Sequence, residues 1–254
     1  MKITFLGTGT STGIPYIGCD CEVCTSTDLR DKRLRSSIHI EVDGKSLVID
    51  SSPDFRQQML RANIRTLDAI LFTHEHKDHT AGLDDIRAYN ALLKKDIPIY
   101  ARLHVLEQLK REFAYIFSEI KYPGIPSIET HIIENKPFLI DTLCITPIEV
   151  IHYKLPVFGF RIYDFTYITD ASFISDEEIE KIKGSKVVVI NALRKEEHIS
   201  HFNLAQALAV LEKINAPQAY LTHLSHHMGK HAITSTELPS NVQLAYDTLV
   251  VEME

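Results

Sequence analysis

The 254-residue chain lacks several features that would assign it to a class at once. It has no apolar run of about 18 residues, so we expect no membrane-spanning helix and no membrane partner. It has no apolar signal segment at its N-terminus and only four cysteines, which favours a cytoplasmic location with reduced thiols. Acidic residues outnumber basic ones, 34 to 27, which argues against a broad nucleic-acid surface. A small substrate is easier to reconcile with this excess of acidic residues than a long nucleic acid.

Strand and helix patterns alternate along the chain, which is typical of a layered α/β architecture. No shift in composition marks a boundary, so we predict a single domain over residues 1–254. Asp43-Gly44 lies between apolar runs at 37–42 and 46–49, which predicts a tight antiparallel hairpin. Helices are predicted over 53–64 and, after Asn203, over 204–214. The β-branched run 186–190 predicts a fully buried strand.

The most informative motif is His-Glu-His-Lys-Asp-His over residues 74–79, directly after the apolar run 69–72. Side chains two apart on an extended segment point the same way, so His74 and His76 can share one ion. Asp78 and His79 fall where the chain turns into the next helix, where they could serve a second ion. Imidazole and carboxylate are ligands that zinc accepts, so the string predicts a dinuclear metal site at the end of a strand.

A second cluster places Cys19, Cys21 and Cys24 within six residues. In a reducing compartment, clustered cysteines more often bind a metal than form disulfides. A structural zinc site is closed and tetrahedral, so it needs a fourth ligand, and His226 is our candidate. If the chain stays extended after His223, His226 would point away from the catalytic ligands, because odd offsets alternate faces.

Two further features are interpreted as structural, and a third is left open. Cys144 stands alone in an apolar segment and is expected to pack in the core. The basic stretch 30–35 is interrupted by acid, so we expect a solvated loop. The aromatic residues between 115 and 126 could cover the pocket or simply pack on the surface, and the pattern leaves both open.

Several segments accompany the histidine string along nearly the full length of the chain. They are the strand over residues 3–6, Leu47-Val48-Ile49-Asp50, His152, Tyr167-Ile168-Thr169-Asp170 and Leu221-Thr222-His223. Together they resemble the metallo-β-lactamase superfamily. The resemblance implies an α/β fold, a four-layer αββα sandwich of the metallo-β-lactamase type. It also implies that His152 binds the first ion, His223 the second, and Asp170 bridges them. Asp50 is interpreted as a residue that fixes an imidazole tautomer through a hydrogen bond.

The cysteine element, taken with Thr-His-x-Ser-His at 222–226, narrows the resemblance to the phosphoribosyl cyclic phosphodiesterase (PhnP-like) group. That resemblance implies a zinc ion on Cys19, Cys21, Cys24 and His226. It also implies that His201 contacts the phosphate and protonates the leaving oxygen. The group required for pyrroloquinoline quinone biosynthesis has a similar cysteine element, so the substrate stays open.

We therefore predict a dinuclear metal-dependent phosphodiesterase that opens a cyclic or small nucleotide-like phosphodiester with a metal-bridging hydroxide. Asp78 would orient this nucleophile. The expected cofactors are two divalent ions, Zn or Mn, and one structural Zn. One alternative is an RNA 3′-end processing nuclease, although the chain has no Gly- and Lys-rich arm. Another is a non-hydrolytic binding protein of the pyrroloquinoline quinone type, although every ligand position is filled. The exact substrate, the catalytic metal and a homodimer are left open.

Overall fold

The computed structural model of the protein describes residues 1–120 and 122–253. No helix in these two ranges has the length and apolar character needed to cross a membrane. The chain forms two compact units, each with its own seven-stranded sheet. Unit 1 comprises Met1–Gly7, Arg35–Glu134 and Thr248–Glu254, and unit 2 comprises Thr8–Leu34 and Asn135–Asp247. The single domain expected over 1–254 stays a prediction.

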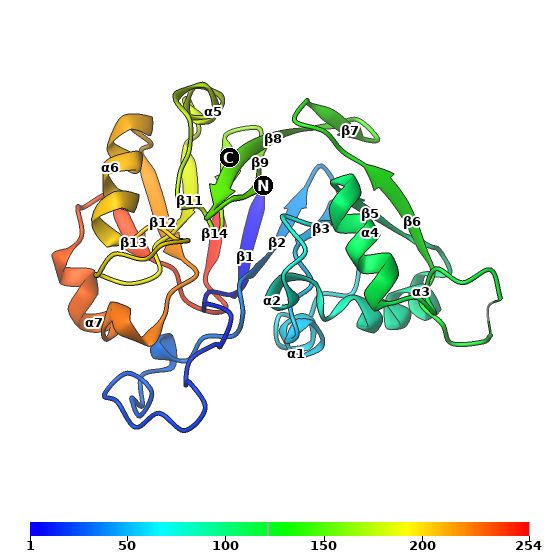
Figure 1. Ribbon diagram of the computed structural model, residues 1–254, viewed down its shortest axis with the longest axis horizontal. Helices are drawn as coiled ribbons and strands as arrows, with labels where there is room; N and C mark the ends of the chain where they lie inside the picture. Colours follow the sequence, from blue (N-terminus) through cyan, green and yellow to red (C-terminus); the bar gives the residue numbers. More distant parts are fainter. Residues whose placement is uncertain (121, 254) are drawn as a thin grey trace. The chain divides into compact units, whose positions relative to one another are not determined.

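Unit 1 contains a mixed sheet with strand order β14-β1-β2-β3-β4-β5-β6 (Figure 1). Neighbouring strands are antiparallel from β14 to β3 and parallel from β3 to β6. The strands are β1 (Lys2–Gly7), β2 (Ser37–Val42), β3 (Lys45–Ile49), β4 (Ala69–Leu71), β5 (Ile97–Ala101), β6 (Ile128–Ile132) and β14 (Val250–Glu252).

The hairpin between β2 and β3 forms as predicted, with Val42 opposite Lys45. Asp43 and Gly44 both have positive φ, 50° and 75°, which is the left-handed conformation that a tight hairpin turn requires. The parallel strands β3 and β4 are buried along almost their whole length. They read as continuous apolar runs because parallel strands are usually covered on both faces.

The helices of unit 1 pack on an apolar core that includes Phe55, Met59, Tyr89 and Leu109. They are α1 (Phe55–Arg61), α2 (Lys77–Thr80), the 3-10 helix η2 (Leu83–Ile86), α3 (Arg87–Leu93) and α4 (Leu103–Glu112).

Helix α1 is shorter than the predicted range 53–64. The side chain of Ser52 accepts the backbone N–H of Asp54, and the Asp54 carboxylate pairs with Arg35, so these residues form a turn before the helix. Beyond the helix, Asn63 has a φ of 53°, which ends the helical path.

The aromatic segment 115–126 includes Lys121, which lies outside the described residues. Tyr115 and Phe117 pack against the apolar core of unit 1. The hydroxyl of Tyr115 also donates a hydrogen bond to Asp84. These two aromatic side chains therefore contribute to packing, which was one of the two expectations for this segment.

Unit 2 contains the second mixed sheet, with strand order β13-β12-β11-β10-β9-β8-β7 (Figure 1). Its strands are parallel from β13 to β10 and antiparallel from β10 to β7. They are β7 (Phe138–Ile140), β8 (Leu143–His152), β9 (Leu155–Ile162), β10 (Phe165–Tyr167), β11 (Val187–Asn191), β12 (Gln218–Thr222) and β13 (Val242–Leu244). The predicted buried strand at 186–190 is confirmed as β11, which is fully buried.

The helices of unit 2 are α5 (Asp176–Ile182), α6 (Leu204–Ile214) and α7 (His231–Thr234), with 3-10 helices η1 (Leu29–Asp31), η3 (His226–Met228) and η4 (Ser235–Glu237). Helix α6 spans the predicted residues. Its N-terminus is closed by a capping box, in which Asn203 accepts the N–H of Gln206 and the Gln206 side chain accepts the N–H of Asn203. Its apolar face packs with α5 and the sheet in one core.

Two structural expectations for unit 2 are wrong. Cys144 is exposed, because β8 alternates at that point and Cys144 lies on its outward face. The basic stretch is not a solvated loop, since Arg33 and Asp31 are buried. The Arg33 guanidinium donates to Thr8 Oγ1 at 2.7 Å and to the carbonyl of Ala245 at 2.5 Å. Burial lowers the pKa of Arg33 to about 10.

Candidate metal centres and active site

Unit 1 gathers the four ligands of the histidine string at the carboxyl end of β4. The ring centroids of His74 and His76 lie 4.6 Å apart, and those of His74 and His79 lie 4.2 Å apart. Asp78 Oδ2 lies 3.3 Å from His79 Nε2. His76 is the N-cap residue of α2, so Asp78 and His79 do lie on the next helix, as predicted. The local chain path alone brings these donors together.

Asp50 supports this ligand set from the end of β3. Its carboxylate accepts the Nδ1–H of His79 at 2.7 Å, the backbone N–H of Thr73 at 2.8 Å and the Thr73 hydroxyl at 2.8 Å. Thr73 Oγ1 also lies 2.9 Å from His74 Nδ1. These bonds engage the Nδ1 atoms of His79 and His74, so Nε2 is the ring atom that each could offer to a metal. Burial raises the pKa of Asp50 while His79 and Thr73 oppose this shift.

Unit 2 carries His152, Asp170 and His223, which the resemblance implied as the remaining ligands. Asp170 Oδ1 lies 3.3 Å from His223 Nε2. His152 donates Nδ1–H to the carbonyl of Ser200 at 2.7 Å, which leaves its Nε2 for a metal. Thr169 Oγ1 donates to Asp170 Oδ2 at 2.6 Å and lies 3.4 Å from His223 Nδ1.

Asp50, Asp170 and His223 share an unusual backbone conformation. Their φ angles are 65°, 59° and 56°. Non-glycine residues adopt this left-handed region rarely, and such strain is concentrated at functional sites. All three follow a parallel strand of their own sheet, where the chain must turn sharply while presenting a side chain at the edge. Sequence patterns gave no indication of this strain.

His201 lies among the ligands of unit 2. Its ring centroid is 4.6 Å from that of His152 and 5.0 Å from that of His223. Its Nδ1 atom is buried without a hydrogen-bond partner in the described chain and lies 3.7 Å from Asp170 Oδ1. Burial lowers the pKa of His201 to about 3 although Asp170 opposes the shift, so the ring is neutral at pH 7.

Several supporting residues had no sequence signal, because their roles depend on neighbours that are distant in the chain. Asn191, at the end of β11, accepts the N–H of Ala171 at 2.7 Å and donates to its carbonyl at 2.9 Å. This clamp fixes the turn that carries Asp170. Thr73, Thr169 and Ser200 orient ligands in the same indirect way.

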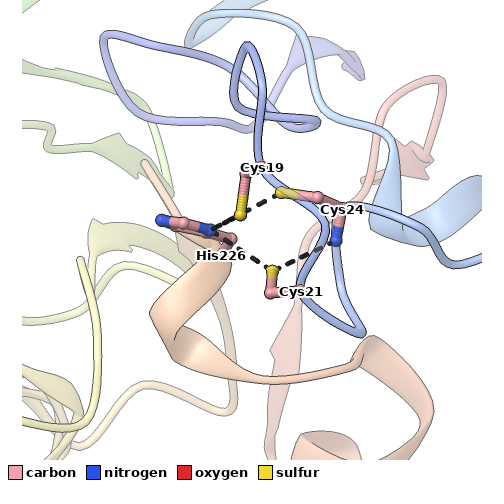
Figure 2. Close-up of side chains that lie close together, drawn as sticks. All are labelled: Cys19, Cys21, Cys24 and His226. Carbon is pink, nitrogen blue, oxygen red and sulfur yellow. Dashed lines mark hydrogen bonds between the residues drawn. The ribbon is translucent and has the colours of Figure 1, made fainter.

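The cysteine cluster lies wholly within unit 2, and its four side chains converge on one point (Figure 2). His226 Nδ1 lies 3.4 Å from the sulfur atoms of Cys19 and Cys21 and 3.5 Å from that of Cys24. The four donor atoms all lie within 4.8 Å of one another. Three thiols and one imidazole in this arrangement fit a closed tetrahedral zinc site.

The surroundings of the cysteines act differently on each thiol. The backbone N–H of Cys24 is the main cause that lowers the pKa of Cys21 to about 6. Burial raises the pKa of Cys24 to about 11. A bound cation favours the thiolate form of each, because the thiolate is the metal ligand.

His226 reaches the cysteines by a route that differs from the expectation. The chain does not stay extended after His223, because Ser225 caps the 3-10 helix η3 that begins at His226. The ring of Tyr16 is stacked on the His226 ring, with centroids 5.6 Å apart. This stacking and the tight helical turn orient the imidazole toward the sulfur atoms.

The sequence and the fold of this chain are similar to those of known proteins. A model of the beta-lactamase superfamily domain matches residues 45–224. The crystal structure of a diphosphatase from the PhnP family has a TM-score of 0.93 and 38% identity, covering 100% of this chain and 98% of that one. Zinc-bound PqqB from Methylobacterium extorquens has a TM-score of 0.82 at 18% identity, with full coverage of both chains. An octanoyltransferase of Porphyromonas gingivalis is 41% identical over 98% of this chain, which spans only 51% of that protein.

The fold and these matches show that the chain belongs to the metallo-β-lactamase superfamily, which confirms the predicted α/β fold class. Within the superfamily, the chain belongs to the PhnP family, since the similarity to the diphosphatase extends over nearly the full length of both chains. The fold of this superfamily implies divalent metal ions, and the His, Asp and Cys donors described above suit such ions.

Proposed function

We propose that this protein is a metal-dependent phosphodiesterase that opens a cyclic or small nucleotide-like phosphodiester. The observation that supports this proposal is His201, a buried imidazole placed beside the metal-ligand residues of unit 2 with an unpartnered Nδ1 atom. A group in this position is suited to contact an anionic oxygen of the substrate.

Two divalent ions, Zn or Mn, would be held by imidazole and carboxylate donors, and one Zn by the cysteine cluster. When bound, paired divalent ions lower the pKa of a water molecule and neutralise phosphoryl oxygens. The proposed ligands of the divalent pair are His74, His76, Asp78, His79, His152, Asp170 and His223.

The protein's own residues set the geometry of the reaction. Asp78, in the first turn of α2, would orient the attacking water, and Asp50 holds His79 in one tautomer. His201 is neutral in the protein alone, since burial lowers its pKa. A phosphate anion against the ring raises the pKa of His201 and so favours its protonated form. In that form the ring would give its proton to the leaving oxygen.

The two alternatives are less well supported. An RNA 3′-end nuclease would need a basic surface, whereas this chain has a formal net charge of -7 and no Gly- and Lys-rich arm. A non-hydrolytic quinone-cofactor binding protein would not need His201 in addition to a full set of ligands.

Octanoyl transfer is a third activity that the comparisons raise. The protein with that name is about twice as long as the matched region, because this chain spans 51% of it. The activity of that longer protein is therefore not assigned to this chain, and an octanoyl thioester belongs among the substrates to be tested.

The first test combines elemental analysis with a substrate panel. We expect about three metal ions per chain, from the donor sets above. We also expect turnover of a chromogenic phosphodiester and a ribose cyclic phosphate, but not of precursor tRNA or an octanoyl thioester. One ion or fewer in protein never exposed to chelator, or turnover of the thioester alone, would contradict the proposal.

The second test is His201→Ala. This variant should keep both ions at the His and Asp ligands yet lose roughly 10²–10⁴-fold in turnover, the usual scale of general acid–base catalysis. A diester with a phenolate leaving group needs little proton donation, so its rate should fall less than that of a ribose cyclic phosphate. Equal losses would mean that His201 binds the phosphate without giving a proton. Loss of an ion would show that His201 is a ligand instead.

A further inference from the structure

The loop between β11 and α6 carries a second imidazole that the proposed reaction does not use. His198 is partly buried, and its Nδ1 atom accepts the backbone N–H of Ser200 at 3.3 Å. Ser200 Oγ also lies 3.2 Å from the same atom. Because Nδ1 acts as an acceptor, the hydrogen of the neutral ring is on Nε2. His198 therefore has a donor that is not used by Ser200.

The backbone of Ser200 connects two histidines of this region. Its carbonyl accepts the Nδ1–H of His152 at 2.7 Å, and its N–H binds Nδ1 of His198. The two backbone groups of this one residue thus set the tautomer of both rings, one as a candidate metal ligand and the other as a hydrogen-bond donor.

The imidazoles of unit 2 lie beside one another. His198 lies 5.2 Å from His201, with ring planes inclined by 31°, and His201 lies next to His152 and His223. His198 belongs to none of the metal-ligand groups found among the described residues. It is therefore one ring removed from the candidate ligands, where it could contact a group that extends beyond the reacting phosphate.

The loop that carries His198 also contacts a positively charged side chain, Arg194. Arg194 donates to the carbonyl of Glu197 at 2.7 Å, which holds its guanidinium against this loop. Burial lowers the pKa of His198, and the charge of Arg194 lowers it further. The N-terminus of α6 offers little to an anion, because its capping box uses the N–H groups of Asn203 and Gln206. The N–H of Leu204 is also used, by the carbonyl of Arg194.

We propose that His198 is a specificity-determining residue that donates Nε2–H to a second phosphoryl group, with Arg194 adding positive charge. This inference rests on the proposed function and extends it to small nucleotide-like diphosphate esters. In their hydrolysis, the oxygen of water bonds to the phosphorus beside His201. The bridging P–O bond breaks, and the leaving phosphate takes its electron pair and a proton. His198 would bind that leaving phosphate.

The test compares three variants on two substrates. His198→Ala removes the ring, His198→Gln keeps an N–H donor near the position of Nε2, and His198→Asn keeps an acceptor near the position of Nδ1. The substrates are a nucleoside diphosphate ester and a ribose cyclic phosphate, which has one phosphoryl group. His198→Ala should lose roughly 10- to 100-fold in kcat/KM on the diphosphate ester, the range for a hydrogen bond to a charged group. It should change little on the cyclic phosphate, and Gln but not Asn should restore the loss.

A structural role for His198 predicts a different pattern. If His198 only supports Ser200 and thereby His152, then Asn should rescue, both substrates should suffer equally, and metal content should fall. That pattern overturns the inference, as does an unchanged rate in His198→Ala. His131→Ala is a matched control, because His131 is also partly exposed and stacks on Tyr100.

A binding measurement separates this inference from the proposed function. Calorimetry on metal-loaded protein should show that His198→Ala weakens inorganic pyrophosphate binding by about tenfold more than orthophosphate binding. If the wild type hydrolyses no phosphoester, the proposed function fails, and the pyrophosphate comparison still decides the role of His198. Equal weakening of both anions would contradict that role.

Discussion

The two units of this protein assemble their functional residues in different ways. Unit 1 carries His74, His76, Asp78 and His79 in one six-residue string, and only Asp50 comes from elsewhere. Unit 2 collects its ligands from the ends of three separate strands and adds a cysteine cluster that joins residues 19–24 to His226. The first set depends mainly on local chain path, whereas the second depends on strand pairing. We therefore expect mutations to separate stability from chemistry more clearly in unit 2.

The largest expected effect is on the stability of unit 2. Cys21→Ser should lower the free energy of unfolding by about 4 kcal/mol or more, since a closed metal site ties distant segments together. For a chain of this size, that corresponds to a fall of roughly 10 °C in Tm. Turnover by molecules that remain folded should change far less. Cys144→Ser is the control, because this exposed thiol belongs to none of the metal-ligand groups formed by the described residues. Unchanged melting with lost turnover would make the cysteines catalytic.

The next effect concerns ligand orientation in unit 1. Asp50→Asn keeps the size of the side chain but weakens its acceptance of the His79 Nδ1–H. Metal affinity or activity should fall roughly 10–100-fold, the usual consequence of losing such a supporting bond. Titration with a competing chelator measures the affinity directly. A variant that binds metal as tightly as the wild type would show that the string in unit 1 needs no support.

Both units contain a buried histidine that should make stability depend on pH. In unit 1, His39 donates Nε2–H to Ser46 Oγ at 2.7 Å, because the Ser46 hydroxyl donates to the carbonyl of Thr66. In unit 2, His231 Nδ1 lies 3.2 Å from Arg33 Nη2. Burial lowers the pKa of each to about 4. The unfolded chain then binds more protons below about pH 6.5, so stability is full above that value and is lost as pH falls toward 4.

Urea unfolding at pH 7 and pH 5 measures this effect. Each histidine should account for about 2 kcal/mol of the loss. His39→Gln and His231→Gln should each reduce the pH dependence by that amount. If only His231→Gln does so, the charge of Arg33 rather than burial in general is the cause.

The smallest expected effect compares two helix caps within unit 2. Asn203→Ala and Ser175→Ala each remove a side-chain acceptor at a helix N-terminus, of α6 and α5 respectively. Each should lower stability by about 1 kcal/mol. Only Asn203→Ala should also reduce turnover, because Asn203 closes the loop that carries His201. Equal turnover in both variants would show that the cap does not position His201.

The sequence was sufficient for features that depend on local order. The string at 74–79, the hairpin at Asp43-Gly44, the cap at Asn203 and the buried run of β11 follow from side-chain chemistry and periodicity over a few residues. The predicted helix at 53–64 was too long, because the hydrogen bonds of Ser52 and the pairing of Asp54 with Arg35 compete with helix formation. Arg33 was misinterpreted because a charged side chain is buried only when distant groups such as Thr8 and Ala245 accept its hydrogen bonds.

The tertiary structure alone decided which residues support the ligands. Asn191 fixes the turn at Asp170, Ser200 orients both His152 and His198, and Tyr16 stacks on His226. No sequence motif marks these residues, since each acts through a neighbour that the sheet or a loop brings close to it. By itself, the sequence determined the types of metal ligand and the family, because donor chemistry is a property of the residue. Orientation is a property of the folded neighbourhood, so tautomers, strained turns and the exposure of Cys144 required the structure.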